Sequence, residues 1–285
     1  MKMKATLALV LITFVWGLTF PVQKMVFFNA SPFLYNFVRF AIASALSLPI
    51  FGLGNMKYGG TLGLVLAAAY SLQSFGLSIT SSSKSGFITS LYVVIVPLFA
   101  HFLDGERISK RELLAFGLGV VGLYLVTGGI EEVNVGDLMT ILCAVSFALH
   151  VVLITKFSRI IPERELMFPQ FLIVSLVNLF LNVFFDWKVN YPLLFTASFT
   201  AIFATVVAVY VQARYQKILG SNRSALVFMS EPVFAFFLSM MLLGERPATL
   251  QVFGAILMLA SLALGSSAKK TVISPAHRPP RSPDP

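Results

Sequence analysis

The 285-residue sequence has little charge, a single cysteine and no internal polar segment long enough to form a soluble domain. Charged residues make up 12% of the chain, about half of the roughly 25% found in soluble domains. Hydrophobic residues make up 57%, and the mean hydropathy is +0.86. An ordinary soluble domain is therefore excluded. Because Cys143 is the one cysteine, an intrachain disulfide is excluded as well.

Motifs for catalysis and cofactor binding are also missing. The sequence has no phosphate loop, zinc-protease motif, nucleophile elbow or paired-carboxylate set. The glycine pattern Gly117-x-Gly119-x-x-Gly122 lies inside an apolar run with no preceding strand, which argues against a dinucleotide site. His101 and His150 are too isolated to predict a metal site. We therefore expect no enzyme activity, no cofactor and no metal.

What the sequence does contain is a series of apolar runs. Each has about the length that crosses a hydrocarbon core of roughly 30 Å. Short linkers rich in glycine, proline, serine and asparagine separate them. The prediction is an all-α polytopic membrane protein with ten transmembrane helices. The expected spans are residues 5–28, 32–54, 59–79, 85–104, 111–129, 135–156, 167–186, 190–212, 221–243 and 248–267.

The basic residues are distributed unevenly between the predicted loops. With the N-terminus inside, about sixteen of them lie on the inner side and four on the outer side. This bias predicts cytoplasmic N- and C-termini in a multi-pass protein of the cell (inner) membrane, with the lipid bilayer as its surroundings. It also explains the net charge of +9 without nucleic acid, which we do not expect as a partner. The basic, proline-rich tail at 269–285 is expected to be disordered.

Two apolar segments are similar enough to indicate an internal duplication. Residues Lys84–Arg107 and Arg223–Arg246 both begin with a basic residue and a serine, and both end with Gly-Glu-Arg. With five spans in each half, the fourth span ends inside and the ninth ends outside. The two copies then run in opposite directions, as in the inverted repeats of many secondary transporters. The predicted halves are residues 1–130 and 131–268.

These features resemble the EamA family of the drug/metabolite transporter superfamily over residues 5–267. The matching positions are Trp16-Gly17, Arg39-Phe40, the two Gly-Glu-Arg ends and Glu231-Pro232. The resemblance implies a 5+5 inverted repeat with a central cavity lined mainly by spans 1, 3, 4, 6, 8 and 9. It also implies movement of small metabolites, with export of amino acids or related compounds as the expected activity. One departure is that Tyr92 occupies the position that corresponds to Glu231.

Two charged residues are predicted to lie within the membrane. Glu231 lies about nine residues into its span, near the midplane, where a charge costs on the order of 3 kcal/mol. It is a candidate for contacting a substrate amine or a coupled proton, or it is a structural carboxylate beside a kink at Pro232. Arg39 is a candidate for binding a substrate carboxylate, or it snorkels or pairs with a carboxylate or helix end.

Other candidate substrate contacts are polar or aromatic residues inside the spans. Each has a second interpretation, because a buried histidine, glutamine, tyrosine or tryptophan also serves helix packing once its polar atom is bonded. The predicted substrate-binding set is Trp16, Arg39, Gln73, Tyr92, His150, Tyr210 and Glu231. Tyr70 and Gln212 are considered on the same grounds.

The resulting hypothesis is a secondary transporter that moves a small-molecule substrate by alternating access. A proton is the expected coupling partner, with facilitated exchange as the alternative. A membrane-embedded enzyme or a scaffold without transport is the alternative function. Small residues four positions apart, Ala115/Gly119 and Ser261/Gly265, favour close helix contacts, either within the chain or in a homodimer.

Overall fold

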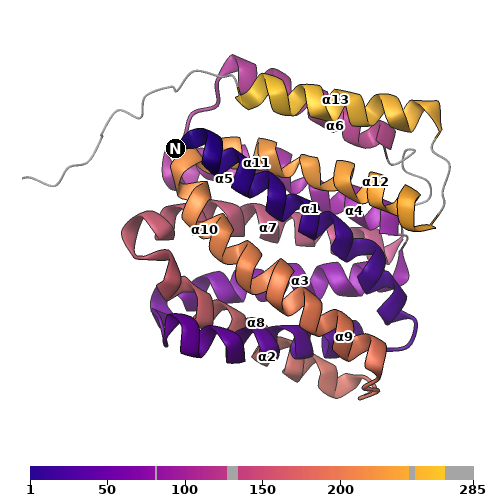
Figure 1. Cartoon of the computed structure of the whole chain (residues 1–285). Coiled ribbons are helices and arrows are strands. Elements are labelled where there is room, and N and C mark those ends of the chain that lie inside the picture. Colours follow the sequence, from indigo (N-terminus) through magenta and orange to yellow (C-terminus); the bar gives the residue numbers. More distant parts are fainter. Residues whose placement is uncertain (81, 127–133, 244–247, 267–285) are drawn as a thin grey trace, which may run out of the picture.

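The computed structural model describes residues 1–80, 82–126, 134–243 and 248–266, and this part of the chain is built of helices (Figure 1). The second Gly-Glu-Arg sequence (244–246), Glu131, Glu132 and the tail at 269–285 lie outside the described residues. The helices are, in order, α1 (Lys2–Phe27), α2 (Pro32–Phe51), α3 (Met56–Ile79), α4 (Ser82–Ser90), α5 (Tyr92–Asp104), α6 (Lys110–Val126), α7 (Val135–Ile160), η1 (Glu163–Leu166), α8 (Met167–Leu181), η2 (Asn182–Phe184), α9 (Tyr191–Phe199), η3 (Thr200–Val207), α10 (Ala208–Leu219), α11 (Ser221–Phe228), α12 (Ser230–Leu243) and α13 (Thr249–Ser266).

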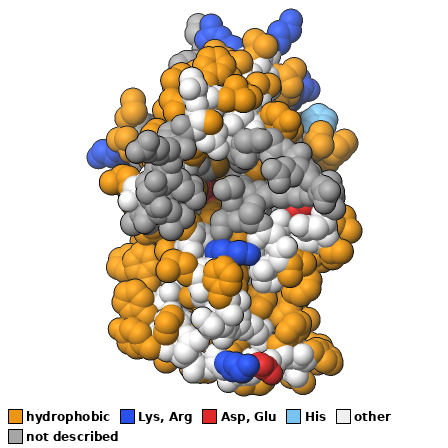
Figure 2. Space-filling view, turned by 90° about the vertical axis from the view of Figure 1, so that its right-hand side faces the viewer, with side chains coloured by type: hydrophobic (Ala, Val, Ile, Leu, Met, Phe, Trp, Pro, Cys, Tyr) orange, Lys and Arg blue, Asp and Glu red, His pale blue; other side chains and the backbone are white. Residues whose placement is uncertain are grey.

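Much of the described helical structure is apolar enough to cross a membrane. Seven segments meet both the length and the hydropathy required, and a shorter apolar helix spans Thr249–Gly265. Large hydrophobic side chains such as Leu11, Phe102 and Phe180 are exposed on the outside, as expected for a lipid-facing surface. Hydrophobic side chains also surround the rim of the end that Figure 2 shows. The all-α polytopic class is thus confirmed, while the count of ten spans stays a prediction.

Helix ends agree closely with the predicted spans, with two extensions. The helix predicted to end at 156 continues to Ile160, and the one predicted to end at 212 continues through α10 to Leu219. Both extensions carry basic residues, Arg159 and Lys217, that bind acidic side chains. Apolar length marks the part of a helix inside the bilayer, so it underestimates a helix that continues into water.

The Gly-Glu-Arg sequence at 105–107 ends α5, and its glutamate caps the start of α11. Gly105 adopts a left-handed conformation with φ +65°, and Glu106 then turns back into the bundle. Its carboxylate accepts the backbone N–H groups of Ser221 (3.0 Å) and Asn222 (3.1 Å), the first residues of α11. Gly220, with φ +89°, leaves room for this carboxylate, because a Cβ there would lie 2.6 Å from Glu106 Oε1. Glu106 therefore caps a helix 115 residues away along the chain.

The α6 and α13 helices pack through small residues. The Ser261 hydroxyl donates a hydrogen bond to the Ala115 carbonyl (2.6 Å), and a Cβ on Gly119 would lie 3.0 Å from Ser261 Oγ. Gly122 and Gly254 face each other so closely that a Cβ on either would lie 2.6–2.7 Å from the other's carbonyl oxygen. A Cβ on Gly265 would lie 3.4 Å from Ala115 Cβ, so all four predicted small residues meet at one helix contact within the chain, and the homodimer stays a prediction.

This contact predicts a large stability difference between two glycines of the same helix. Gly122→Ala should lower the free energy of unfolding by about 1–3 kcal/mol, because the added methyl group meets backbone on α13. Gly117→Ala is the matched control, since a Cβ there has open space and alanine favours helix. Thermal unfolding of the detergent-solubilised variants measures the difference. Equal melting temperatures would contradict the packing described here.

Candidate functional site

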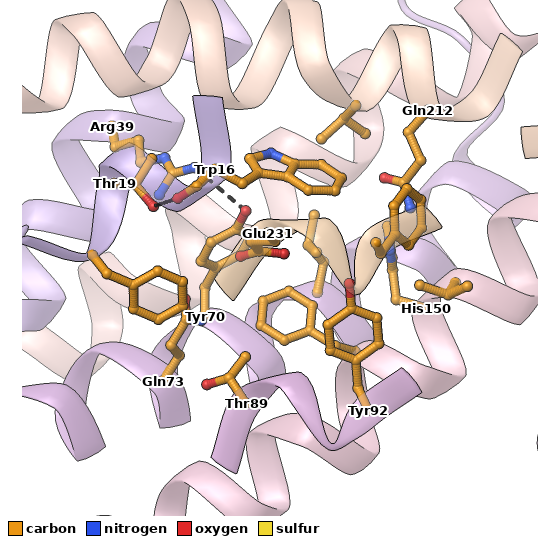
Figure 3. A pocket seen from close by; sticks show the side chains of 16 residues that line it. Trp16, Thr19, Arg39, Tyr70, Gln73, Thr89, Tyr92, His150, Gln212 and Glu231 are labelled. Atoms are coloured by element: carbon orange, nitrogen blue, oxygen red, sulfur yellow. Dashed lines mark hydrogen bonds between the residues drawn. The ribbon is translucent and has the colours of Figure 1, made fainter. Parts of the chain in front are cut away.

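A cavity with about 610 Å³ of empty space, open solvent included, lies within the helix bundle (Figure 3). Polar and aromatic side chains from distant parts of the sequence point into it, and both charged candidates are among them. The lining residues are Trp16, Thr19, Phe20, Arg39, Leu66, Tyr70, Gln73, Thr89, Tyr92, Phe147, His150, Val151, Val209, Gln212, Phe228 and Glu231. They come from α1, α2, α3, α4, α5, α7, α10, α11 and α12. This set contains the spans that the resemblance implied and adds α2 through Arg39.

Glu231 reaches the cavity from an interrupted helix. The chain leaves α11 at Phe228 and starts α12 at Ser230, with a break at Met229. Pro232 is the third residue of α12, where helical N–H groups have no partner within the helix. Its ring favours a kink or a break here, because in a regular helix it would clash with the Phe228 carbonyl four residues earlier. The predicted kink beside Glu231 thus coincides with a one-residue break at Met229, whose backbone stays in the right-handed helical region (φ −60°, ψ −14°).

The Glu231 carboxylate lies in this cavity without a partner. The residue is 8% exposed, and among the described residues its carboxylate forms no hydrogen bond or ion pair. An ionised carboxylate with so little water needs a positive charge beside it. A proton or a cationic substrate group would supply that charge.

Arg39 presents the opposite charge to the same cavity. It is 1% exposed, so it does not snorkel. Its Nε donates to Thr205 Oγ1 (2.8 Å) and its Nη2 to the Tyr70 hydroxyl (3.3 Å), and the guanidinium lies 4.7 Å from the centre of the Tyr70 ring. Nη1 is buried and has no hydrogen-bond partner. Within the described part of the chain no carboxylate pairs with Arg39, so a carboxylate on a ligand would find an unused donor here.

An irregular helical segment holds Arg39 and Trp16 in place. In η3 the helix is π-helical, and the Thr205 hydroxyl donates to the Thr200 carbonyl (2.9 Å) while its oxygen accepts from Arg39. The Trp16 indole N–H donates to the Ala204 carbonyl (3.0 Å). Single π-helical turns within α-helices are frequent at functional sites. Here the turn supplies acceptors to two cavity residues on other helices.

His150 and Tyr92 lie toward the opposite side of the cavity from Arg39 (Figure 3). His150 Nε2 lies 3.2 Å from Gln170 Oε1, which fixes the orientation of the ring. Tyr92 is the first residue of α5, directly after the break at Leu91 that separates α5 from α4. Tyr92 and Glu231 thus occupy similar places, each just after a helix interruption.

The structure brings together six of the seven predicted substrate contacts: Trp16, Arg39, Gln73, Tyr92, His150 and Glu231. Tyr210 does not line the cavity. Its ring stacks on Phe51 with centroids 5.1 Å apart, and its hydroxyl accepts from Arg214 (3.0 Å). Successive residues of an α-helix are rotated by about 100° around its axis, so Tyr210 faces away from its cavity-lining neighbours Val209 and Gln212. Substrate binding by any of these residues stays a prediction.

Several of the lining residues were not predicted from the sequence. Thr19 and Phe20 follow Trp16 at helical spacing of three and four, and Leu66 lies four residues before Tyr70. That periodicity was the available signal. Phe147 and Phe228 looked like ordinary packing residues, and no sequence feature distinguishes them. In the described ranges no group of three or more His, Cys, Asp or Glu side chains is placed to hold a metal ion.

Comparison with known proteins places the chain in a family. The EamA-like transporter family model matches residues 3–128 and again residues 134–267. An uncharacterized transporter of Archaeoglobus fulgidus is 33% identical over 267 residues, which cover 93% of this chain and 86% of that protein. The uncharacterized transporter YcxC of Bacillus subtilis is 30% identical over 161 residues, covering 51% of this chain and 52% of YcxC.

A solved structure shares the fold. It superimposes with a TM-score of 0.77 at 18% identity, and the match covers 92% of this chain and 97% of the other. At that identity the likeness concerns the fold alone. The functional class follows from the two matches to the family model and from the relative at 33% identity. The protein belongs to the EamA-like transporter family of the drug/metabolite transporter superfamily and is a multi-pass membrane transporter.

Proposed function

We propose that the protein is a secondary transporter that exports amino acids or related small metabolites across the cytoplasmic membrane by alternating access. The observation that carries the proposal is the pair of opposite, incompletely satisfied charges in one central cavity. Arg39 has an unused buried donor, and Glu231 has no partner among the described residues. A zwitterionic molecule with one carboxylate and one ammonium group satisfies both at once.

The cavity walls suit the remainder of such a substrate. Trp16, Tyr70 and Tyr92 offer aromatic faces and polar tips, and Leu66 and Val209 offer small apolar contacts. Ligand sites commonly combine a mostly apolar wall with a few polar groups that fix orientation.

The architecture behind this proposal is a 5+5 inverted repeat of ten spans, with a proton as the coupling ion. It is supported by the paired breaks at Leu91 and Met229, which fall at nearly corresponding positions of the two sequence copies. Discontinuous helices beside a midplane site are typical of inverted-repeat transporters. Cytoplasmic termini follow from the basic-residue bias.

The proposal predicts selective flux of zwitterions by the purified protein. Proteoliposomes loaded with unlabelled amino acids should accumulate labelled amino acid by counterflow, at least tenfold faster than the matching decarboxylated amine or deaminated acid. That preference follows from the two charges in the cavity. Liposomes without protein give the background rate of uptake. Absence of flux for every class tested, in protein shown to be folded, would contradict transport, and equal flux of all three analogues would contradict recognition of a zwitterion.

A further inference from the structure

A second pocket, separate from the central cavity, opens where α1, α10, α11 and α13 meet at one end of the bundle. It has about 360 Å³ of empty space, open solvent included, and is lined by Lys2, Thr6, Leu219, Arg223, Leu226, Val227 and Leu262. Figure 1 shows the start of α1 close to α11, and the two helices are in contact. We call this the terminal pocket. It shares no residue with the central cavity.

The lining of the terminal pocket divides by chemistry. Lys2 and Arg223 bring two positive charges, and Thr6 brings a hydroxyl. The remaining residues are aliphatic and come from three helices. A ligand that matches this surface has an anionic group joined to an apolar body. A free metabolite of the kind proposed for the central cavity would leave the aliphatic part unmatched.

The two basic residues of the terminal pocket favour an anionic group. Arg223 Nε lies 3.4 Å from the Glu112 carboxylate, so part of its charge is already balanced. Lys2 is exposed and forms no ion pair with another described residue. Lys2 and Arg223 together favour an anionic group at this end of the terminal pocket, and the phosphodiester of a phospholipid is such a group.

The surroundings supply a path for acyl chains. On α1, Met3 and Leu7 are exposed beside the pocket residues Lys2 and Thr6. On α13, Leu259 is exposed one turn from Leu262. An acyl chain leaving the terminal pocket would therefore continue along apolar side chains rather than enter water. Basic pockets between transmembrane helices on the cytoplasmic side are suited to anionic lipid head groups, and the basic-residue bias predicts that this end faces the cytoplasm.

We propose that the terminal pocket is a binding site for an anionic phospholipid, with the phosphate at Lys2 and Arg223 and an acyl chain between α1 and α13. The site is independent of the transported substrate. Its function is to hold one lipid at the contact between α11, which leads to Glu231, and the peripheral helix α13. Phosphatidylglycerol is the probe for this chemistry, and phosphatidylcholine with identical acyl chains is the neutral comparison.

Native mass spectrometry of the full detergent-solubilised chain tests the site. The wild type should bind the first phosphatidylglycerol at least tenfold more tightly than phosphatidylcholine. Lys2→Gln should weaken phosphatidylglycerol binding about fivefold, the effect of one basic residue near an anionic lipid. Lys4→Gln is the matched control, because Lys4 is exposed on the same helical turn but does not line the pocket. It should leave binding unchanged.

A second pair of variants tests the apolar half of the site. Leu262→Trp should fill the pocket and weaken phosphatidylglycerol binding with both basic residues intact, whereas Leu259→Trp, on the exposed surface, should not. Equal affinity for the two lipids, or equal effects of Lys2→Gln and Lys4→Gln, would overturn the proposal. Competition by free glycerol 3-phosphate as strong as that by the lipid would also overturn it, because the site would then bind a soluble anion.

Discussion

Glu231→Gln is expected to lower amino-acid flux in proteoliposomes by about 10–100-fold, because it removes the charged partner of the substrate ammonium or the proton. The protein should still fold. Glutamine has nearly the same volume, and the carboxylate has no hydrogen bond with a described residue to lose. Initial rates of counterflow at low substrate concentration measure the loss. Under proton coupling, an imposed pH gradient should accelerate the wild type and leave the residual flux of the variant unchanged.

Glu165→Gln is the matched control for this experiment. Glu165 lies in η1, does not line the cavity, and its side chain forms no hydrogen bond or ion pair within the described residues. It should transport like the wild type. If Glu231→Gln instead reduced the folded yield while the surviving protein transported normally, Glu231 would be a structural residue.

Arg39→Lys is expected to change which molecules are carried. Lysine keeps the positive charge but loses the planar guanidinium, so it cannot hold Thr205, Tyr70 and a ligand carboxylate simultaneously. Flux of amino acids should fall about 10–100-fold, while flux of the matching decarboxylated amines should change less than threefold. Competition between the two labelled substrates in one proteoliposome preparation measures this ratio directly.

Two further variants distinguish a role of Arg39 in binding the ligand from a role in supporting the fold. Arg214→Lys changes an exposed arginine outside the cavity and should have no effect on either substrate. Thr205→Val removes the acceptor for Arg39 Nε and should reproduce part of the selectivity change. A uniform loss for amines and amino acids in Arg39→Lys would show that Arg39 supports the fold rather than the ligand.

Helix positions were largely predictable from the sequence. The length of an apolar run indicates a helix that crosses the bilayer, and turn-forming residues indicate where it ends. The starts at Pro32 and Val135 follow capping residues, Ser31 and Asn134, that the chain itself supplies. The π-helical segment η3 was not predictable. Its irregularity is stabilised by Arg39 and Trp16, whose positions depend on the packing of other helices.

The charged members of the cavity were predictable for a different reason. A charge in an apolar span has to face protein or water, so Glu231 and Arg39 were expected inside the bundle. Their partners were not predictable. The expectation that Arg39 pairs with a carboxylate or a helix end did not anticipate its bonds to Thr205 and Tyr70. Tyr210 shows the limit of residue type alone, because its neighbours Val209 and Gln212 face the cavity and it does not.

The Glu106 cap on α11 joins a loop after α5 to the start of the helix that leads to Glu231. Arg159 of α7 contacts the same carboxylate, so three separate helices meet at one buried anion. A movement that draws α5 away from α11 would leave two backbone N–H groups and one carboxylate in need of water. Opening the bundle at this end would therefore require water to reach these groups, and their hydration would become part of the free-energy cost of that step.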